Sequence, residues 1–167
     1  LTEGPKAGSH CLFFVPHGTP GVEHVRTPAY THTYRAHHPI YRFTNVRVPA
    51  ENRIGEEGGG MSFTYDWFRY ERLMIAARCC GAAARLIDEA TAFARDRPMS
   101  GEMLGDKQAV QFMLADSLTE LWAARLMTYR TAEAIDANED VKVSHAQSSM
   151  AKLYASEMAN RVADRAV

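Results

Sequence analysis

The sequence predicts an α+β fold, in which a short antiparallel β segment precedes an antiparallel bundle of three long helices. Up to Glu57 the apolar residues come in short runs separated by Pro, Gly, His and Thr, a pattern typical of strands and turns. After the glycine run at residues 58–60, apolar residues recur with a helical period and few Gly or Pro residues interrupt them. We therefore expect two domains, residues 1–57 and residues 58–167.

The β segment is predicted from two apolar runs, HCLFFV at residues 10–15 and IYRFTNVRVP at residues 40–49. Polar and apolar side chains alternate only imperfectly in the second run, so both faces of that strand are expected to be partly covered. Between the runs, PHGTPGVE at residues 16–23 supplies the Pro and Gly residues that favour a turn.

The helices are predicted over residues 61–95, residues 103–136 and from residue 142 to the end. The breaks between them, DRPMSGE and ANEDV, are short, so consecutive helices should lie antiparallel as neighbours in a bundle. In the first helix, the small residues of CCGAAA should let another helix pack closely. We expect Gly81 to lie at that contact, because it has no side chain to keep the helices apart. We expect the apolar side of the second helix to face the core; it comprises Phe112, Met113, Leu114, Leu118, Leu121, Trp122 and Leu126.

Composition excludes several classes of partner. The formal net charge is −1 and basic residues are scattered among acidic ones, so no basic stripe is present to follow a nucleic acid backbone. No apolar run has the length of a bilayer span, and the amino end lacks the order of a signal peptide. Nucleic acid and membrane are therefore not expected as partners.

The cysteines and the chain ends give two further expectations. Cys79 and Cys80 are adjacent in a helical pattern and point apart, so the three cysteines cannot form a disulfide framework, which favours a reducing, cytoplasmic setting. The chain begins with Leu1 and stops within a helical apolar pattern, so we expect it to be a fragment of a longer protein.

Glu71 is the first candidate for chemistry. On helical spacing its neighbours are Trp67, Phe68, Met74 and Ile75, all apolar. A carboxylate in such surroundings either finds a partner or has its pKa raised, and a raised pKa suits a general base. The structural alternative is that the carboxylate pairs with a nearby arginine, Arg69 or Arg72.

A cluster of histidines near the amino end is the second candidate. His32, His37 and His38 lie close together in the sequence, with His10 and Cys11 as the other possible ligands. Their spacing does not supply the regular ligand set of a zinc site. We therefore favour solvated or hydrogen-bonded histidines and expect no metal site.

Three stretches together resemble the acyl-CoA dehydrogenase family: YRFTNVRVPAENRIGEEGGGM, WFRYERLMIAARCCGAAARLIDEATAFARDR and GDKQAVQFMLADS. Any one of them alone would be a weak signal. The resemblance implies that the chain covers the end of the family's middle β-domain and most of its carboxyl-terminal helical domain, which is a four-helix bundle. It also implies an FAD cofactor and removal of hydrogen from the α and β carbons of an acyl-CoA.

The resemblance assigns roles to four residues. Glu71 stands where some branches of the family carry the base, whereas most take it from a loop beyond Val167. Arg72 resembles the arginine beside that base, with a role in orienting substrate or carboxylate. Arg97 and Gln108 match residues that contact FAD, the arginine reaching the cofactor of a neighbouring subunit. We expect both to lie close together on an open surface. The loop between them carries Ser100 before Gly101, where many members carry Phe stacked near the adenine.

The implied partners are an acyl-CoA substrate, an electron-transfer flavoprotein or similar acceptor, and further copies of the chain in a homo-oligomer. Two other functions compete with a dehydrogenase. One is a flavin oxidase or monooxygenase of the same fold, and the other is a helical scaffold without turnover.

Overall fold

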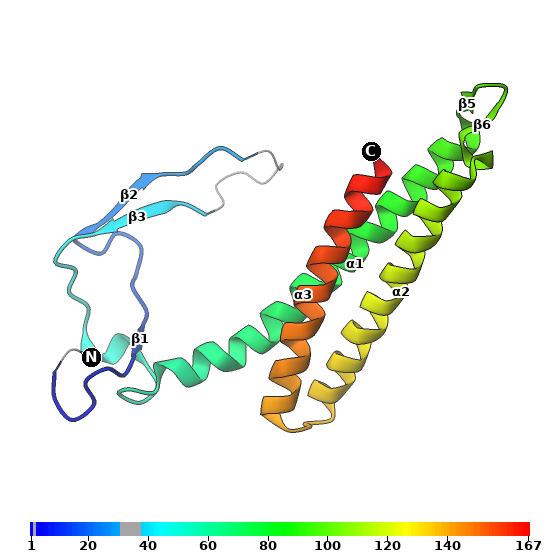
Figure 1. Cartoon of the computed structure of the whole chain (residues 1–167). Helices are drawn as coiled ribbons and strands as arrows, with labels where there is room; N and C mark the ends of the chain where they lie inside the picture. The colour runs from blue at the N-terminus through cyan, green and yellow to red at the C-terminus, as the bar shows by residue number, and fades with distance from the viewer. Residues whose placement is uncertain (2, 31–37) are drawn as a thin grey trace. The chain divides into compact units, whose positions relative to one another are not determined.

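The computed structural model describes residues 1, 3–30 and 38–167 of the chain. The chain divides into two compact units, Leu1–Thr64 and Tyr65–Val167, and each is described by itself. The first contains the strands β1 to β4, and the second is mainly helical and also contains the short strands β5 and β6 (Figure 1). Short antiparallel strands followed by three long helices confirm the predicted fold class.

The first unit contains two small antiparallel pairs. Strand β1 (Leu12–Phe13) pairs with β4 (Arg53–Ile54), and β2 (Val22–Arg26) pairs with β3 (Ile40–Phe43). A one-turn 3₁₀ helix, Ala50–Asn52, precedes β4.

The predicted strands differ from the observed ones in two respects. Strand β3 ends at Phe43, well before residue 49, because Asn45 has a φ of 49°, which belongs to the left-handed region and breaks an extended strand. Strand β2 begins inside the segment that was predicted as a turn. Its exposed, polar sequence carries little strand signal of its own, and pairing with β3 specifies it.

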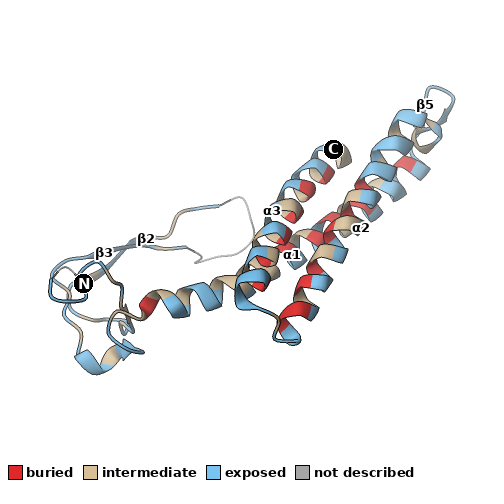
Figure 2. Ribbon diagram, turned by 60° about the horizontal axis from the view of Figure 1, so that its bottom comes forward, coloured by how far each residue is buried: buried red, intermediate tan, exposed pale blue. Residues whose placement is uncertain are grey.

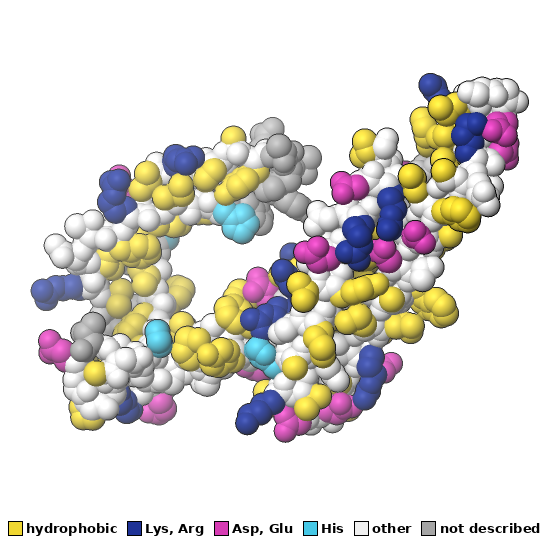
Figure 3. Space-filling model, viewed as in Figure 1, with side chains coloured by type: hydrophobic (Ala, Val, Ile, Leu, Met, Phe, Trp, Pro, Cys, Tyr) yellow, Lys and Arg dark blue, Asp and Glu magenta, His cyan; other side chains and the backbone are white. Residues whose placement is uncertain are grey.

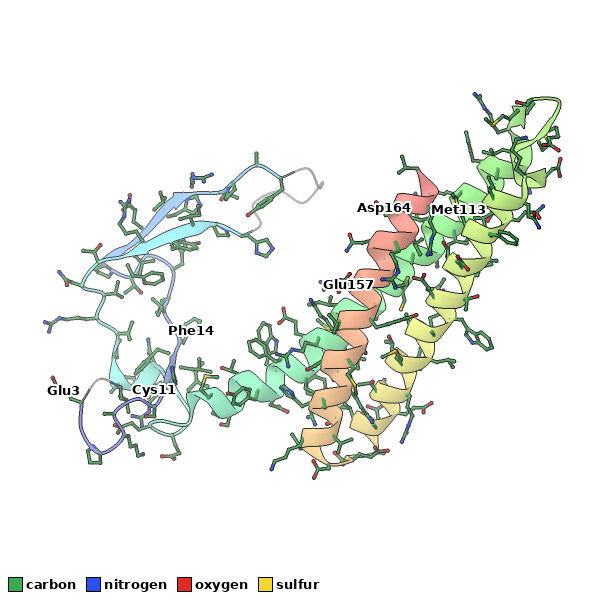
Figure 4. All side chains as sticks on the ribbon, in the orientation of Figure 1. Glu3, Cys11, Phe14, Met113, Glu157 and Asp164 are labelled. Carbon is green, nitrogen blue, oxygen red and sulfur yellow. The ribbon has the colours of Figure 1, made fainter. Side chains whose placement is uncertain are left out.

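The glycine run before the first long helix allows close backbone packing. The Gly60 amide donates a hydrogen bond of 2.8 Å to the carbonyl oxygen of His10. A Cβ atom on Gly60 would lie 2.8 to 2.9 Å from backbone atoms of His10, Cys11 and Leu12. Cys11, on the segment that leads into β1 (Figure 4), accepts the Gly58 amide at 3.2 Å. Residues 58–60 therefore join the start of the helix to the first strand pair.

Three helices account for most of the remaining chain: α1 (Gly60–Asp96), α2 (Gln108–Asp136) and α3 (Val141–Ala166). The first and third agree with the prediction to within a residue or two. Asp140 caps α3, since its carboxylate accepts the Lys142 amide at 2.7 Å and the Val143 amide at 3.3 Å. The connection between α2 and α3 is thus a tight, capped turn.

The second helix begins five residues later than predicted. Strands β5 (Pro98–Met99) and β6 (Glu102–Met103) form a tiny hairpin, and the 3₁₀ turn Leu104–Asp106 follows. The Asp106 carboxylate accepts a hydrogen bond from the Met103 amide at 3.1 Å. This hydrogen bond stabilises a non-helical turn of the backbone. Local hydrogen bonding thus overrides the helical period of this segment.

The core of the helical unit lies between α1, α2 and α3 and is built mainly from small side chains (Figure 2). Small residues at facing positions let the helices approach closely, and larger side chains fill the rest. The buried cluster comprises Ala76, Cys80, Ala83, Ile87, Leu121, Ala124, Ala151, Ala155, Met158 and Val162.

Two packing predictions are wrong. A Cβ atom on Gly81 would have no neighbour within 4 Å, so in the described chain no helix packs against this glycine; Cys80 and Ala83 make the contact instead. On α2, of the predicted core set only Leu121 is buried, and Trp122 is 68% exposed. The neighbouring helices cover a single stripe of α2, which runs through Ser117, Leu121, Ala124, Thr128, Thr131 and Ile135.

Apolar side chains are consequently exposed over the helical unit, as the space-filling view shows (Figure 3). None of the helices in the described part of the chain combines the length and the apolar character that crossing a membrane requires.

Candidate functional site

Glu71 lies in the fourth turn of α1 and is half-buried. Two of its helical neighbours, Trp67 and Met74, are 57% and 50% exposed. The apolar side chains around the carboxylate therefore do not enclose it on that side. Across the described residues, neither a hydrogen bond nor an ion pair joins the Glu71 carboxylate to another group. The structure thus leaves this carboxylate available to an external proton donor.

The predicted structural alternative, pairing of Glu71 with an arginine, is wrong. Arg69 donates to the Asp66 carboxylate at 2.8 Å and to the Ser144 hydroxyl at 3.4 Å. Arg72 turns toward α3. Residues one and two positions apart on a helix do not share a face, which explains why both guanidinium groups point away from Glu71.

The Arg72 guanidinium is held between α1 and α3. Its Nη1 atom lies 3.2 Å from His145 Nε2 and 3.1 Å from the Ser149 hydroxyl oxygen. Its central carbon lies 5.2 Å from the centre of the Phe68 ring, within range of a cation–π interaction. Tyr65 meets the His145 ring edge-on at 6.1 Å. The arginine is therefore half-buried among neutral groups.

Arg97 and Gln108 mark the two ends of the loop between α1 and α2. Arg97 directly follows α1, and its carbonyl oxygen accepts the Leu104 amide at 2.8 Å. Gln108 is the first residue of α2. Both residues are exposed, so their donor groups are accessible from solvent.

Residues 58–167 match the family model described as the acyl-CoA dehydrogenase C-terminal domain. The chain belongs to the acyl-CoA dehydrogenase family. It is 35% identical over 165 residues to cyclohex-1-ene-1-carbonyl-CoA dehydrogenase of Geobacter metallireducens, covering 98% of this chain and 43% of the relative. It is 39% identical over 123 residues to the caffeyl-CoA reductase-Etf complex subunit CarC of Acetobacterium woodii, covering 74% of this chain and 32% of the relative.

A solved member of the family has the same fold. Butyryl-CoA dehydrogenase of Megasphaera elsdenii superposes with a TM-score of 0.84 at 29% identity, over 95% of this chain and 40% of that structure. The chain thus spans between 32% and 43% of the length of these acyl-CoA dehydrogenase relatives. The resemblance predicted from the sequence is confirmed.

Of the three clustered histidines, the described part of the chain contains His38. His32 and His37 lie outside the described residues, and His38 has a left-handed φ of 52°. Within the part of the chain that is described, no group of three or more His, Cys, Asp or Glu side chains is arranged to hold a metal ion.

A cavity that the sequence did not predict opens in the helical unit, with a volume of about 220 Å³. Its walls are largely apolar, and Arg165 and Ser117 supply the polar groups. None of the four predicted site residues lines it. Its walls come from Ile87, Ala90, Phe93, Ala94, Leu104, Val110, Met113, Leu114, Ser117, Val162, Arg165, Ala166 and Val167.

Two contacts of Arg72 were missed by sequence reasoning, namely those with His145 and Ser149. They lie 73 and 77 positions from the arginine. A helical period places them on α3 and gives no indication that they face Arg72.

Proposed function

We propose that the protein is an FAD-dependent oxidoreductase that removes hydrogen from the α and β carbons of an acyl-CoA thioester. In this proposal residues 1–57 form the end of the family's middle β-domain, and residues 58–167 form part of its helical domain. The observation that carries the proposal is Glu71, a half-buried carboxylate with no partner among the described residues, on a helix of a family domain.

Glu71 acts as the general base in this reaction. It takes a proton from the α carbon of the substrate. Arg72 does not touch Glu71 in the described chain and instead orients the substrate. Bound FAD would supply the acceptor for the hydride that leaves the β carbon.

The chemistry of Arg97 and Gln108 fits the diphosphate of FAD. A guanidinium and an amide provide donors suited to anionic oxygens, and the amino end of α2 adds backbone amides with a favourable dipole. Both side chains are exposed, so the anion can reach them. These two residues are the ones that would hold the cofactor.

Partners follow from the same proposal. One relative is named as a subunit of an Etf complex, which supports an electron-transfer flavoprotein as the acceptor of electrons. Exposed apolar side chains on α2, including Leu118 and Trp122, support a homo-oligomer. All three cysteines are free thiols, which supports a reducing compartment such as the cytoplasm.

The direct test uses the protein expressed from its complete reading frame. We expect it to purify with FAD and expect the flavin absorbance to bleach when an acyl-CoA is added without oxygen. A preparation without flavin would support the scaffold. Rapid reoxidation by oxygen, with release of hydrogen peroxide, would support an oxidase. A flavin that no acyl-CoA reduces would contradict the proposed substrate class.

A further inference from the structure

Arg72 has no acidic partner among the described residues, in contrast to the neighbouring arginine. Arg69 is paired with Asp66, whose carboxylate lies 2.8 Å from the guanidinium. Within the described part of the chain, the hydrogen bonds of Arg72 are to an imidazole and a hydroxyl, and its guanidinium also lies over an aromatic ring. Because neutral partners do not cancel its charge, the Arg72 guanidinium keeps its attraction for a polar or anionic group of a ligand.

The Ser149 hydroxyl has a fixed direction. It donates its proton to the carbonyl oxygen of His145 at 2.9 Å, so only its lone pairs remain for Arg72 at 3.1 Å. The hydroxyl can therefore serve the arginine solely as an acceptor. The third turn of α3 thus presents an oriented acceptor to the guanidinium.

His145, one helical turn before Ser149, also offers an acceptor to the Arg72 guanidinium. The two ring nitrogens of His145 lie 3.2 Å and 3.5 Å from Arg72 Nη1, so either tautomer of the imidazole places an acceptor nitrogen within reach of the guanidinium. Tyr65 packs against the imidazole edge and limits its rotation. Phe68 lies against the guanidinium and restricts its plane.

We infer that His145 and Ser149 are positioning residues that hold the Arg72 guanidinium for substrate recognition. The inference rests on the proposed acyl-CoA chemistry and adds to it the groups on α3 that aim the arginine. Neither residue touches the reacting atoms in this scheme. Both act through Arg72, so their loss changes substrate binding more than the chemical step.

The test compares disruptive and conservative variants in the full-length flavoprotein. His145→Leu removes the acceptor, whereas His145→Gln keeps a neutral acceptor of similar reach. We expect His145→Leu to raise KM for the acyl-CoA about tenfold with kcat changed less than about threefold, and His145→Gln to restore KM to within about threefold. FAD content and Tm should stay at the parent values.

Serine variants provide the matched control. Ser149→Ala should raise KM about fivefold, whereas Ser156→Ala should leave it unchanged, although Ser156 is on the same helix and also donates to a backbone carbonyl. In an Arg72→Ala background neither Ser149→Ala nor His145→Leu should have a further effect, since the group they position is gone.

The possible failures are distinguishable. If the parent protein binds no FAD or is not reduced by acyl-CoA, the proposed function fails and this inference fails with it. If the parent reacts normally and His145→Leu and Ser149→Ala leave KM unchanged, only the inference is overturned. A fall in Tm that accounts for the whole loss, with no rescue by His145→Gln, would assign both residues to helix packing and would also overturn it.

Discussion

Two glycines of α1 have opposite surroundings. A Cβ atom on Gly60 would lie within 3.0 Å of three backbone atoms, the nearest being the carbonyl oxygen of His10 at 2.8 Å. The same atom on Gly81 would meet nothing within 4 Å. One glycine is therefore required by close packing, and the other only weakens the helix.

Alanine at these two positions should change stability in opposite directions. We expect Gly60→Ala to destabilise the protein by about 1–3 kcal/mol, because the backbone of residues 10–12 must move. Gly81→Ala should stabilise it by about 0.5–1 kcal/mol through helix propensity. Urea denaturation of both variants measures the free energies of unfolding, and equal effects at the two sites would contradict the described packing.

The candidate site was partly predictable at the residue scale. Helical spacing alone placed four apolar residues around Glu71, and the structure keeps that arrangement. The same spacing could not show where Arg72 turns, because its hydrogen-bond partners His145 and Ser149 lie on α3. The role of Glu71 as a base was suggested by its apolar neighbours and by the family resemblance, the roles of Arg72, Arg97 and Gln108 came from the resemblance, and all four remain proposals.

Between elements, Glu120 of α2 forms ion pairs with two arginines of α3. Its carboxylate accepts Arg161 Nε at 2.8 Å and Arg165 Nη2 at 2.9 Å. Partial burial acts to raise the pKa of Glu120, but the bonds from Arg165 and Arg161 outweigh burial and hold that pKa below its ordinary value. A lowered pKa in the folded state means that the ionised form stabilises the fold.

The ion pairs of Glu120 predict a pH-dependent loss of stability. At pH 7, Glu120→Gln should destabilise the protein by about 1 kcal/mol. The parent loses the same contribution as the pH falls through and below about 4.3, so the difference between the two proteins should shrink there. Glu133→Gln is the control, because the Glu133 carboxylate is exposed and lies 3.9 Å from Arg130. A difference in unfolding free energy between Glu120→Gln and the parent that persists undiminished at pH 3 would contradict the stabilising role of the ionised Glu120.

The helices were predicted best where the helical spacing of apolar residues extends over many turns. The first and third helices follow from apolar spacing over many turns, whereas the start of α2 depends on Asp106 and its turn. Strand β2 depends on its pairing with β3. Which face of α2 is buried could not be predicted, because spacing defines an apolar stripe but does not say which neighbours cover it.

For the whole molecule, the proposed cofactor site gives a binding prediction. Arg97→Ala and Gln108→Ala should each weaken FAD binding about tenfold, because each removes donors to the diphosphate. Arg85→Ala is the matched control, since Arg85 is an exposed arginine of α1 paired with Glu89. Titration of the apoprotein with FAD measures the affinities. Parent-like FAD affinity in both Arg97→Ala and Gln108→Ala would remove this loop from the cofactor site.

The role of Glu71 as the base is tested most directly by the rate of anaerobic flavin reduction in the full-length protein carrying Glu71→Gln. The amide keeps the shape of the side chain but cannot take the α proton, so the rate should fall by about a hundredfold or more while FAD stays bound. Glu89→Gln makes the same chemical change at an exposed position of α1 and should react at the parent rate. Flavin reduction by Glu71→Gln at nearly the parent rate would contradict the role of Glu71 as the base.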